Sequence, residues 1–272
     1  MYHPIMRKMK IKGFHSFFNC TYNEGYYYHG EHHPFWEVVY CFGGTIGVSF
    51  DEKIYRLRKG DIVIYPPNVH HKLWSEENTR INVLVFSFDG SGEGLKELGG
   101  AYSCDEELQQ KWDEIALNMR ECKEYRRTTG YLHYLEKMPN KYQVVANECE
   151  NNLLLLKEHS FPLGHNKNKS ARDYERIIRT MRENLGDDLT VEEIGMHCGL
   201  SVSTMNNLFR QFNSMGIHEY FLHLKIEESI RFLKSGMTVR ETAEQLGFSN
   251  QSYFSTVFKR VVGESPVQFK KK

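Results

Sequence analysis

Residues 238–260, TVRETAEQLGFSNQSYFSTVFKR, have the pattern of two helices joined by a tight turn. Thr238 suits the N-cap of a first helix, and Gly247 stands where that helix should end, at a position that favours positive φ. Ser249 or Asn250 can then cap a second helix, because each offers a side-chain oxygen to unpaired N–H groups. The stretch predicts a helix-turn-helix unit, a geometry that also occurs in proteins that do not bind DNA.

The two faces of the second helix differ in chemistry. Phe254, Val257 and Phe258 recur at helical spacing and are predicted to be buried. The other face, predicted to be exposed, consists of amides, hydroxyls and cations: Gln251, Ser252, Ser255, Thr256, Lys259 and Arg260. Such a face can read base edges and bind phosphates. It is also compatible with an ordinary helical hairpin whose polar face is solvated.

The same pattern occurs a second time, in residues 189–212, LTVEEIGMHCGLSVSTMNNLFRQF. Thr190 and Gly199 have the same separation as Thr238 and Gly247, and a repeat within one domain is much less probable by chance than either copy alone. Between the copies, apolar periodicity predicts one long helix that begins near Ile217 and is ended by Gly236. A rigid helix would fix the separation of two reading helices, so that they could enter successive major grooves ~34 Å apart.

The N-terminal half has a different periodicity. Short β-branched or alternating runs separated by turn residues predict strands at 36–42, 45–50, 53–57, 61–65 and 81–88. Several short strands at close spacing indicate a small antiparallel barrel or sandwich, at about 10–90.

Helical periodicity returns between about 103 and 159, with Asp105 as an N-cap. In the helix predicted at 142–159, Leu154 and Leu155 widen the apolar surface beyond one stripe, so this surface is either intramolecular core or a dimer interface. Residues 1–160 would then form one domain. A polar segment at 161–170 reads as a linker, and 171–272 reads as an all-helical domain with helix-turn-helix units at about 190–212 and 238–261.

The charge and the cysteine content limit the classes of protein to which the chain can belong. The chain has 35 basic and 35 acidic residues, so any field that attracts DNA must come from local placement. Its six cysteines are scattered with no CxxC pair, which is typical of free thiols in a reducing cytosol. We find no signal-peptide pattern and no apolar run of ~18 residues, and therefore expect a cytoplasmic protein without a membrane span.

The C-terminal domain resembles the AraC family of bacterial transcription regulators, most specifically in QLGFSNQSYFSTVFKRVVGESPVQFK at 245–270. The resemblance implies reading helices at 203–212 and 251–261, with double-stranded DNA as partner, a homodimer, and RNA polymerase as a further partner. The implied DNA-contacting residues are Ser203, Thr204, Asn206, Asn207, Arg210, Gln251, Ser252, Ser255, Thr256, Lys259 and Arg260.

Two positions depart from the family pattern. Members often have arginine where this chain has Asn207 and Thr256. Arginine favours guanine, whereas asparagine pairs with adenine and threonine contacts the thymine methyl group, each good contact giving about 1–3 kcal/mol of discrimination. We therefore predict an operator rich in A·T pairs at these positions.

HHPFWEVVYCFGG at 32–44 and YRLRKGDIVIYPPNVHH at 55–71 resemble the two motifs of the cupin barrel. By this resemblance, metal-ligand positions fall on His33, Glu37 and His71. The leading histidine of the first motif falls on Glu31, with His29 and His32 nearby, and the usual glycine of the second motif is Asn68.

Three interpretations of these residues remain open. The favoured one is an effector pocket for a small polar metabolite such as a sugar, formed by His33, Trp36, Glu37, Tyr40 and His71. The second is a divalent-metal site formed by His33, Glu37 and His71, and the third is a set of loop histidines without a function.

The sequence thus predicts an α+β two-domain chain: a cupin-like antiparallel β-barrel with a helical connector, followed by an all-α double helix-turn-helix. We expect an effector-controlled transcription regulator that is not an enzyme and has no cofactor. Two alternatives are a metal-dependent cupin enzyme with an appended helical domain, and a helical adaptor that binds protein.

Overall fold

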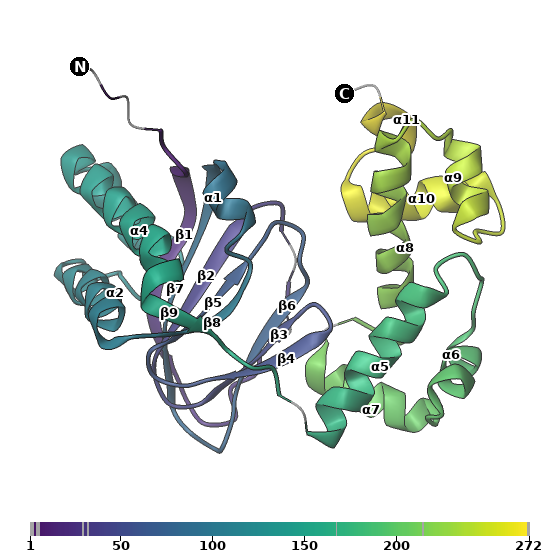
Figure 1. Ribbon diagram of the computed structural model, residues 1–272, viewed down its shortest axis with the longest axis horizontal. Coiled ribbons are helices and arrows are strands. Elements are labelled where there is room, and N and C mark those ends of the chain that lie inside the picture. The colour runs from purple at the N-terminus through teal and green to yellow at the C-terminus, as the bar shows by residue number, and fades with distance from the viewer. Residues whose placement is uncertain are drawn as a thin grey trace. The chain divides into compact units, whose positions relative to one another are not determined.

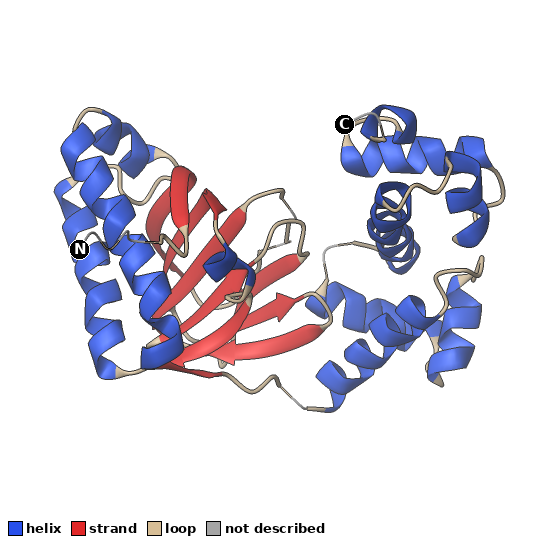
Figure 2. Cartoon of the chain, turned by 45° about the horizontal axis from the view of Figure 1, so that its top comes forward, coloured by secondary structure: helices blue, strands red, loops and turns tan. Residues whose placement is uncertain are grey.

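The computed structural model describes residues 3, 6–28, 30–31, 33–166, 168–213 and 215–270. The chain divides into two compact units, Met1–Asn166 and Lys167–Lys272 (Figure 1). The first unit contains the strands, and the second is helical (Figure 2).

The strands of the first unit are β1 (Lys10–Tyr22), β2 (Trp36–Gly43), β3 (Ile46–Phe50), β4 (Lys53–Leu57), β5 (Asp61–Tyr65), β6 (His71–Ser75), β7 (Ile81–Ser91), β8 (Gly100–Cys104) and β9 (Ser160–Pro162). They form a six-stranded sheet in the order β1-β7-β2-β5-β8-β9 and a three-stranded sheet in the order β4-β3-β6, with antiparallel pairing throughout. The predicted fold class is confirmed. The described strands form two separate antiparallel sheets and do not close into one continuous barrel.

The helices of the first unit are α1 (Glu93–Lys96), α2 (Glu106–Asn118), the 3-10 turn η1 (Met119–Glu121), α3 (Gly130–Glu136) and α4 (Pro139–His159). α2 and α4 lie side by side against the six-stranded sheet (Figure 1). Trp112 and Leu153 pack there with Phe86 in one core cluster. The apolar stripe of α4 is therefore intramolecular core, although Leu154 is 45% exposed.

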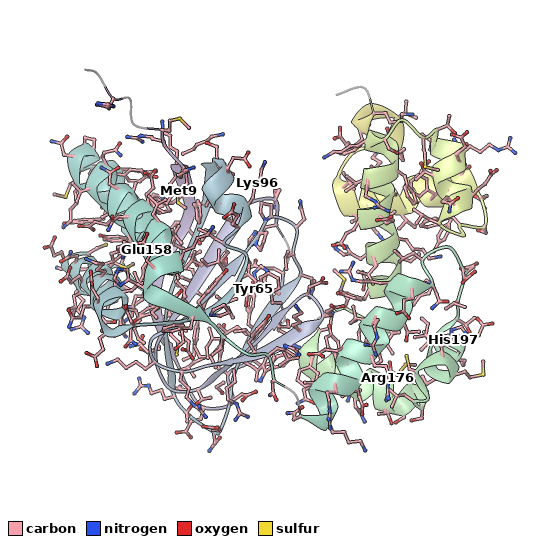
Figure 3. All side chains as sticks on the ribbon, in the orientation of Figure 1. Met9, Tyr65, Lys96, Glu158, Arg176 and His197 are labelled. Carbon is pink, nitrogen blue, oxygen red and sulfur yellow. The ribbon has the colours of Figure 1, made fainter. Side chains whose placement is uncertain are left out.

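A second core cluster lies between the two sheets. It joins Val39 and Tyr65 of the large sheet to Val48 and Leu57 of the small one. Because side chains alternate along a strand, Val39 and Cys41 of β2 face this interior while Val38 and Tyr40 face the helices. Figure 3 labels Tyr65 among the strands of this unit.

The second unit consists of α5 (Lys169–Glu183), α6 (Val191–Cys198), α7 (Val202–Phe212), α8 (Ile217–Lys234), α9 (Val239–Gln245), α10 (Gln251–Val262) and α11 (Pro266–Phe269). Thr190 and Thr238 each form a capping box with a glutamate three residues later. Gly199 (φ 63°) and Gly247 (φ 60°) both adopt the left-handed conformation in the turns. The predicted tandem of helix-turn-helix units, joined by one long helix, is confirmed.

Part of the segment predicted as a linker is ordered secondary structure. Phe161 and Pro162 belong to β9, which pairs with β8, and α5 begins at Lys169. Lys167 lies outside the described residues. None of the described helices combines the length and the apolar composition needed to cross a membrane.

Candidate functional site

The exposed face of α7 carries the side chains predicted to contact DNA. The helix is capped by Ser201, whose hydroxyl accepts a hydrogen bond from the Thr204 N–H at 3.1 Å. Its apolar face is buried through Met205, Leu208 and Phe209. The predicted residues that remain exposed are Ser203, Thr204, Asn206, Asn207 and Arg210.

α10 has the same arrangement. Its cap, Asn250, accepts a hydrogen bond from the Tyr253 N–H at 2.8 Å. Of the predicted contacts, Ser255 is half-buried, and the exposed ones are Gln251, Ser252, Thr256, Lys259 and Arg260. Among the described residues, neither cation has an ion-pair partner, so both are available to phosphates. Tyr253, 41% exposed on the same helix, was not predicted as a contact.

The hydroxyl of Thr256, on α10, forms a hydrogen bond within its own helix. Thr256 Oγ1 donates to the backbone oxygen of Ser252 at 3.0 Å. A threonine held this way has spent its donor, so its methyl group and the acceptor lone pairs of its oxygen remain for a partner. This geometry suits an apolar contact with a thymine methyl group.

The first unit encloses a cavity of about 580 Å³ between its two sheets. Aromatic side chains form much of its wall: Phe18, Tyr22, Tyr26, Tyr28, Phe35 and Tyr65. Arg126 and Thr128 close it from the segment before α3, which is tied to β1 by a hydrogen bond from Phe17 N–H to the Thr128 oxygen (3.0 Å). A cavity of this size and lining suits a small molecule.

Four ionisable side chains converge on one wall of the cavity. His71 Nε2 lies 3.2 Å from Glu37 Oε1 and 3.9 Å from Glu31 Oε1, and His33 Nε2 lies 3.5 Å from Glu37 Oε2. The four potential ligand atoms all lie within 4.8 Å of one another. The sequence-predicted histidines and Glu37 are therefore brought together, and Glu31 joins them through a β-bridge to His71.

Backbone contacts fix the orientation of both imidazoles. His33 Nδ1 lies 2.9 Å from the Phe35 oxygen, and His71 Nδ1 lies 2.9 Å from the Val69 oxygen. Burial alone would raise the pKa of Glu37, but the two imidazoles outweigh burial and lower it to about 2. Burial alone would lower the pKa of His33, but the neighbouring carboxylates raise it. The field in this cluster favours positive charge on the imidazole side.

The second cupin motif keeps its turn although Asn68 replaces the usual glycine. Asn68 adopts a left-handed conformation (φ 66°), which asparagine tolerates better than most residues, and its N–H donates to the His33 oxygen at 2.7 Å. His29 and His32 lie outside the described residues.

Two predicted effector contacts lie away from the cavity. Trp36 and Tyr40 do not line the cavity and belong to the core on the helical side of the sheet. Alternation along β2 explains this, because residues of opposite parity to Glu37 point away from the cavity. The Tyr40 hydroxyl instead donates to Asp113 Oδ1 at 3.1 Å. Sequence reasoning missed Tyr65, whose ring stacks on His71 at 4.1 Å.

Comparison with known proteins assigns both units. A family model described as an AraC-like ligand binding domain matches residues 18–101, and one described as a helix-turn-helix domain matches residues 196–272. Together the matched ranges cover more than half of the chain. The chain belongs to the AraC family. It is a DNA-binding transcription regulator with a ligand-binding domain, as the sequence predicted.

Several relatives are themselves named as regulators. The Msm operon regulatory protein of Streptococcus mutans is 30% identical over 115 residues, which is 41% of either chain. RhaS of Pectobacterium atrosepticum, a transcriptional activator, is 21% identical over 86% of this chain and 85% of its own. The MmsAB operon regulatory protein of Pseudomonas aeruginosa is 24% identical over 89% of this chain and 77% of its own.

Similar solved structures include ToxT from Vibrio cholerae O395, which is 15% identical over 97% of both chains with a TM-score of 0.38. An AraC-type regulator from Chromobacterium violaceum is 19% identical over 38% of this chain and 92% of its own, with a TM-score of 0.36.

Proposed function

We propose that this regulator binds a small polar metabolite in the cavity between its two sheets and that binding changes how α7 and α10 engage double-stranded DNA. The observation that carries the proposal is the cavity itself, with its buried His–Glu cluster, in a chain whose other unit presents two polar reading helices. An effector that binds one arrangement of the chain more tightly than another shifts the population toward it.

The cavity wall supports a hydroxylated effector such as a sugar. Tyr65 is 1% exposed, and its hydroxyl has no hydrogen-bond partner among the described residues. A buried hydroxyl without a partner is costly, and a ligand that supplies one recovers this free energy. Aromatic faces beside His33 and His71 would then contact the apolar side of the same ligand.

On the DNA side, the six exposed polar residues Ser203, Asn206, Asn207, Gln251, Ser252 and Thr256 are assigned to base edges. Arg210, Lys259 and Arg260 are assigned to phosphates, with Thr204 and Ser255 at the margin of the surface. Because Asn207 and Thr256 favour adenine and thymine, the operator is expected to be rich in A·T pairs at the positions they contact.

The assembly and location are part of the proposal. Exposed apolar side chains on α4, Val144 and Leu154, support a homodimer formed by the first unit. RNA polymerase is a further proposed partner. Six unpaired cysteines are in keeping with a reducing cytoplasm.

The test begins with selection of binding sites from random DNA, followed by gel shift. Changing Asn206, Asn207, Gln251 and Thr256 together to alanine is expected to abolish specific binding while the circular dichroism spectrum is unchanged. Changing Arg172 and Glu183, two exposed residues of α5, to alanine is the matched control and should leave binding intact. Retained binding in the quadruple variant would contradict the assignment of these four residues, and absence of specific binding by the parent would favour a protein-binding adaptor.

A further inference from the structure

Residues 163–166, called the strap below, tie the two sheets of the first unit together. Leu163 N–H donates to the oxygen of Ala101 on β8, in the six-stranded sheet, at 2.8 Å. Asn166 N–H donates to the oxygen of Ile54 on β4, in the three-stranded sheet, at 2.6 Å. The effector cavity lies between these sheets. A ligand that changes their separation would therefore lengthen or break one of the two hydrogen bonds.

The strap is also the last part of the first unit. Asn166 ends that unit, and α5 of the second unit begins three residues later, at Lys169. Any effect that is transmitted along the chain from the cavity to the helix-turn-helix units passes through this segment. Its attachment is not only by hydrogen bonds, because the Leu163 side chain packs against the core cluster between the sheets.

A continuous row of rings connects the cavity wall to the strap. His71 stacks on Tyr65 with ring centroids 4.1 Å apart, and Tyr65 stacks on Phe50 at 5.5 Å. Phe50 meets Tyr55 edge to face at 6.5 Å, and Tyr55 meets His165 edge to face at 6.4 Å. Rings at such separations attract one another, so each one helps to fix the position of the next.

The two ends of the row differ in what they contact. His71 and Tyr65 line the cavity, and His165 belongs to the strap. Between them, Phe50 and Tyr55 pack in the core cluster between the sheets. Because Tyr65 is 1% exposed and Tyr55 is 8% exposed, a ring displaced by a ligand has no solvent to move into and displaces its neighbour.

We propose that the strap is the element through which the effector controls the second unit, and that the row of rings carries the effect from the cavity. In one state of the chain the strap is bonded to both sheets, and in the other at least one of its two hydrogen bonds is open. An effector that moves Tyr65 or His71 shifts the equilibrium between these states. This role of the strap depends on the proposed effector binding and specifies the route of regulation.

The first test measures hydrogen exchange at the Leu163 and Asn166 amides of the full chain, without DNA or effector. Exchange at Val85, in the centre of β7, reports global unfolding. Tyr65→Leu removes the ring that stacks on His71 and should speed exchange at both strap amides by about threefold or more, beyond any change at Val85. Tyr65→Phe keeps the ring and should leave strap exchange within about twofold of the parent.

The middle of the row separates transmission from local packing. In a Phe50→Leu background, the addition of Tyr65→Leu should cause no further increase in strap exchange, because the row is already interrupted. Phe18→Leu is the matched control, since Phe18 packs on the same core cluster and lines the cavity but does not belong to the row. In that background Tyr65→Leu should retain its full effect.

The second test asks whether the strap controls DNA binding. Asn166→Pro removes the N–H that donates to Ile54, whereas Asn166→Ala keeps it. We expect the proline variant to differ from the alanine variant by at least about threefold in affinity for the selected operator, because an open strap changes the population of binding-competent chains. Gel shifts with the two purified variants measure this ratio.

Three results would overturn the proposal: unchanged strap exchange in Tyr65→Leu, additive effects of Tyr65→Leu and Phe50→Leu, or equal operator affinity of the two Asn166 variants. If Tyr65→Leu does not fold, His71→Ala tests the cavity end of the same row. The exchange measurement needs neither DNA nor effector, so its failure leaves the proposed regulatory function standing. Conversely, absence of specific DNA binding by the parent would not affect the exchange result.

Discussion

Lys225, in the middle of α8, donates from its buried ammonium group to the backbone oxygen of Leu246 at the end of α9, over 2.9 Å. The same nitrogen donates to the oxygen of Asp187, in the segment before α6, over 2.7 Å. One side chain therefore connects the long helix to the end of α9 and to the segment that leads into the first helix-turn-helix unit. This contact constrains the relative position of the two reading helices before DNA is bound.

Replacing Lys225 with methionine should loosen this connection. The change keeps the apolar stem but leaves two backbone oxygens without a donor, at about 1–3 kcal/mol each if they stay dry. We expect a lower midpoint of thermal unfolding and weaker binding to a full operator, with less change for a fragment that contacts one reading helix. Lys234→Met, an exposed position on the same helix, is the control. Equal effects of the two changes would contradict the role assigned to Lys225.

The two turn glycines make a matched pair for a second prediction. Gly199 and Gly247 have nearly the same φ, but a Cβ atom at Gly199 would meet nothing within 4 Å, whereas one at Gly247 would lie 2.3 Å from the backbone oxygen of Gly186. Gly199→Ala should cost roughly 1–2 kcal/mol, the penalty of a left-handed alanine. Gly247→Ala should cost clearly more, because the packing of the second turn against Gly186 must also open.

Chemical denaturation of the two purified glycine variants measures this difference in the free energy of unfolding. If Gly199→Ala and Gly247→Ala lower the free energy of unfolding equally, the close approach of the second turn to Gly186 is not a constraint on stability.

The helix-turn-helix units could be predicted from sequence because their determinants are local. Each unit can be recognised from a short continuous stretch of sequence, which contains both the N-cap, Thr190 or Thr238, and the turn glycine. β1 was not predicted as one strand, since register shifts near Gly13 and Ser16 break the alternation that marks a strand. α3 was also missed; it begins at Gly130, with no side-chain cap.

The cavity was harder to predict because its wall is assembled from distant segments. His33, Glu37 and His71 were found through two motifs, but Arg126 reaches the cavity only through tertiary pairing with β1. The alternation along β2 separates Tyr40 from the side chains that line the cavity. Starting from Glu37, a period of two leads to Val39, which does line the cavity.

A third prediction contrasts two buried tyrosines of the first unit. The Tyr40 hydroxyl donates to Asp113, whereas the Tyr65 hydroxyl has no partner among the described residues. Tyr40→Phe should lower the free energy of unfolding by about 1 kcal/mol. Tyr65→Phe should leave it unchanged or raise it, because an unsatisfied hydroxyl is removed, and should weaken effector binding.

Thermal unfolding of the two variants, with and without a bound effector once a screen identifies one, separates stability from binding. A destabilised Tyr65→Phe protein would show that the hydroxyl has a partner in solution, such as an ordered water molecule.

The last prediction concerns how Thr256 reads DNA. Because its hydroxyl is held by the Ser252 oxygen, the methyl group is the part that can contact a thymine. Thr256→Val keeps a methyl group in that place and should retain the selected operator, with affinity within a few-fold of the parent. Thr256→Ser keeps the hydroxyl and loses the methyl, and should lose discrimination at one base pair by about 1–3 kcal/mol. Gel shifts with the selected site and its single-base variants measure both. If serine preserves the preference and valine abolishes it, the hydroxyl and not the methyl reads the base, and the helix-bound geometry of Thr256 does not persist on DNA.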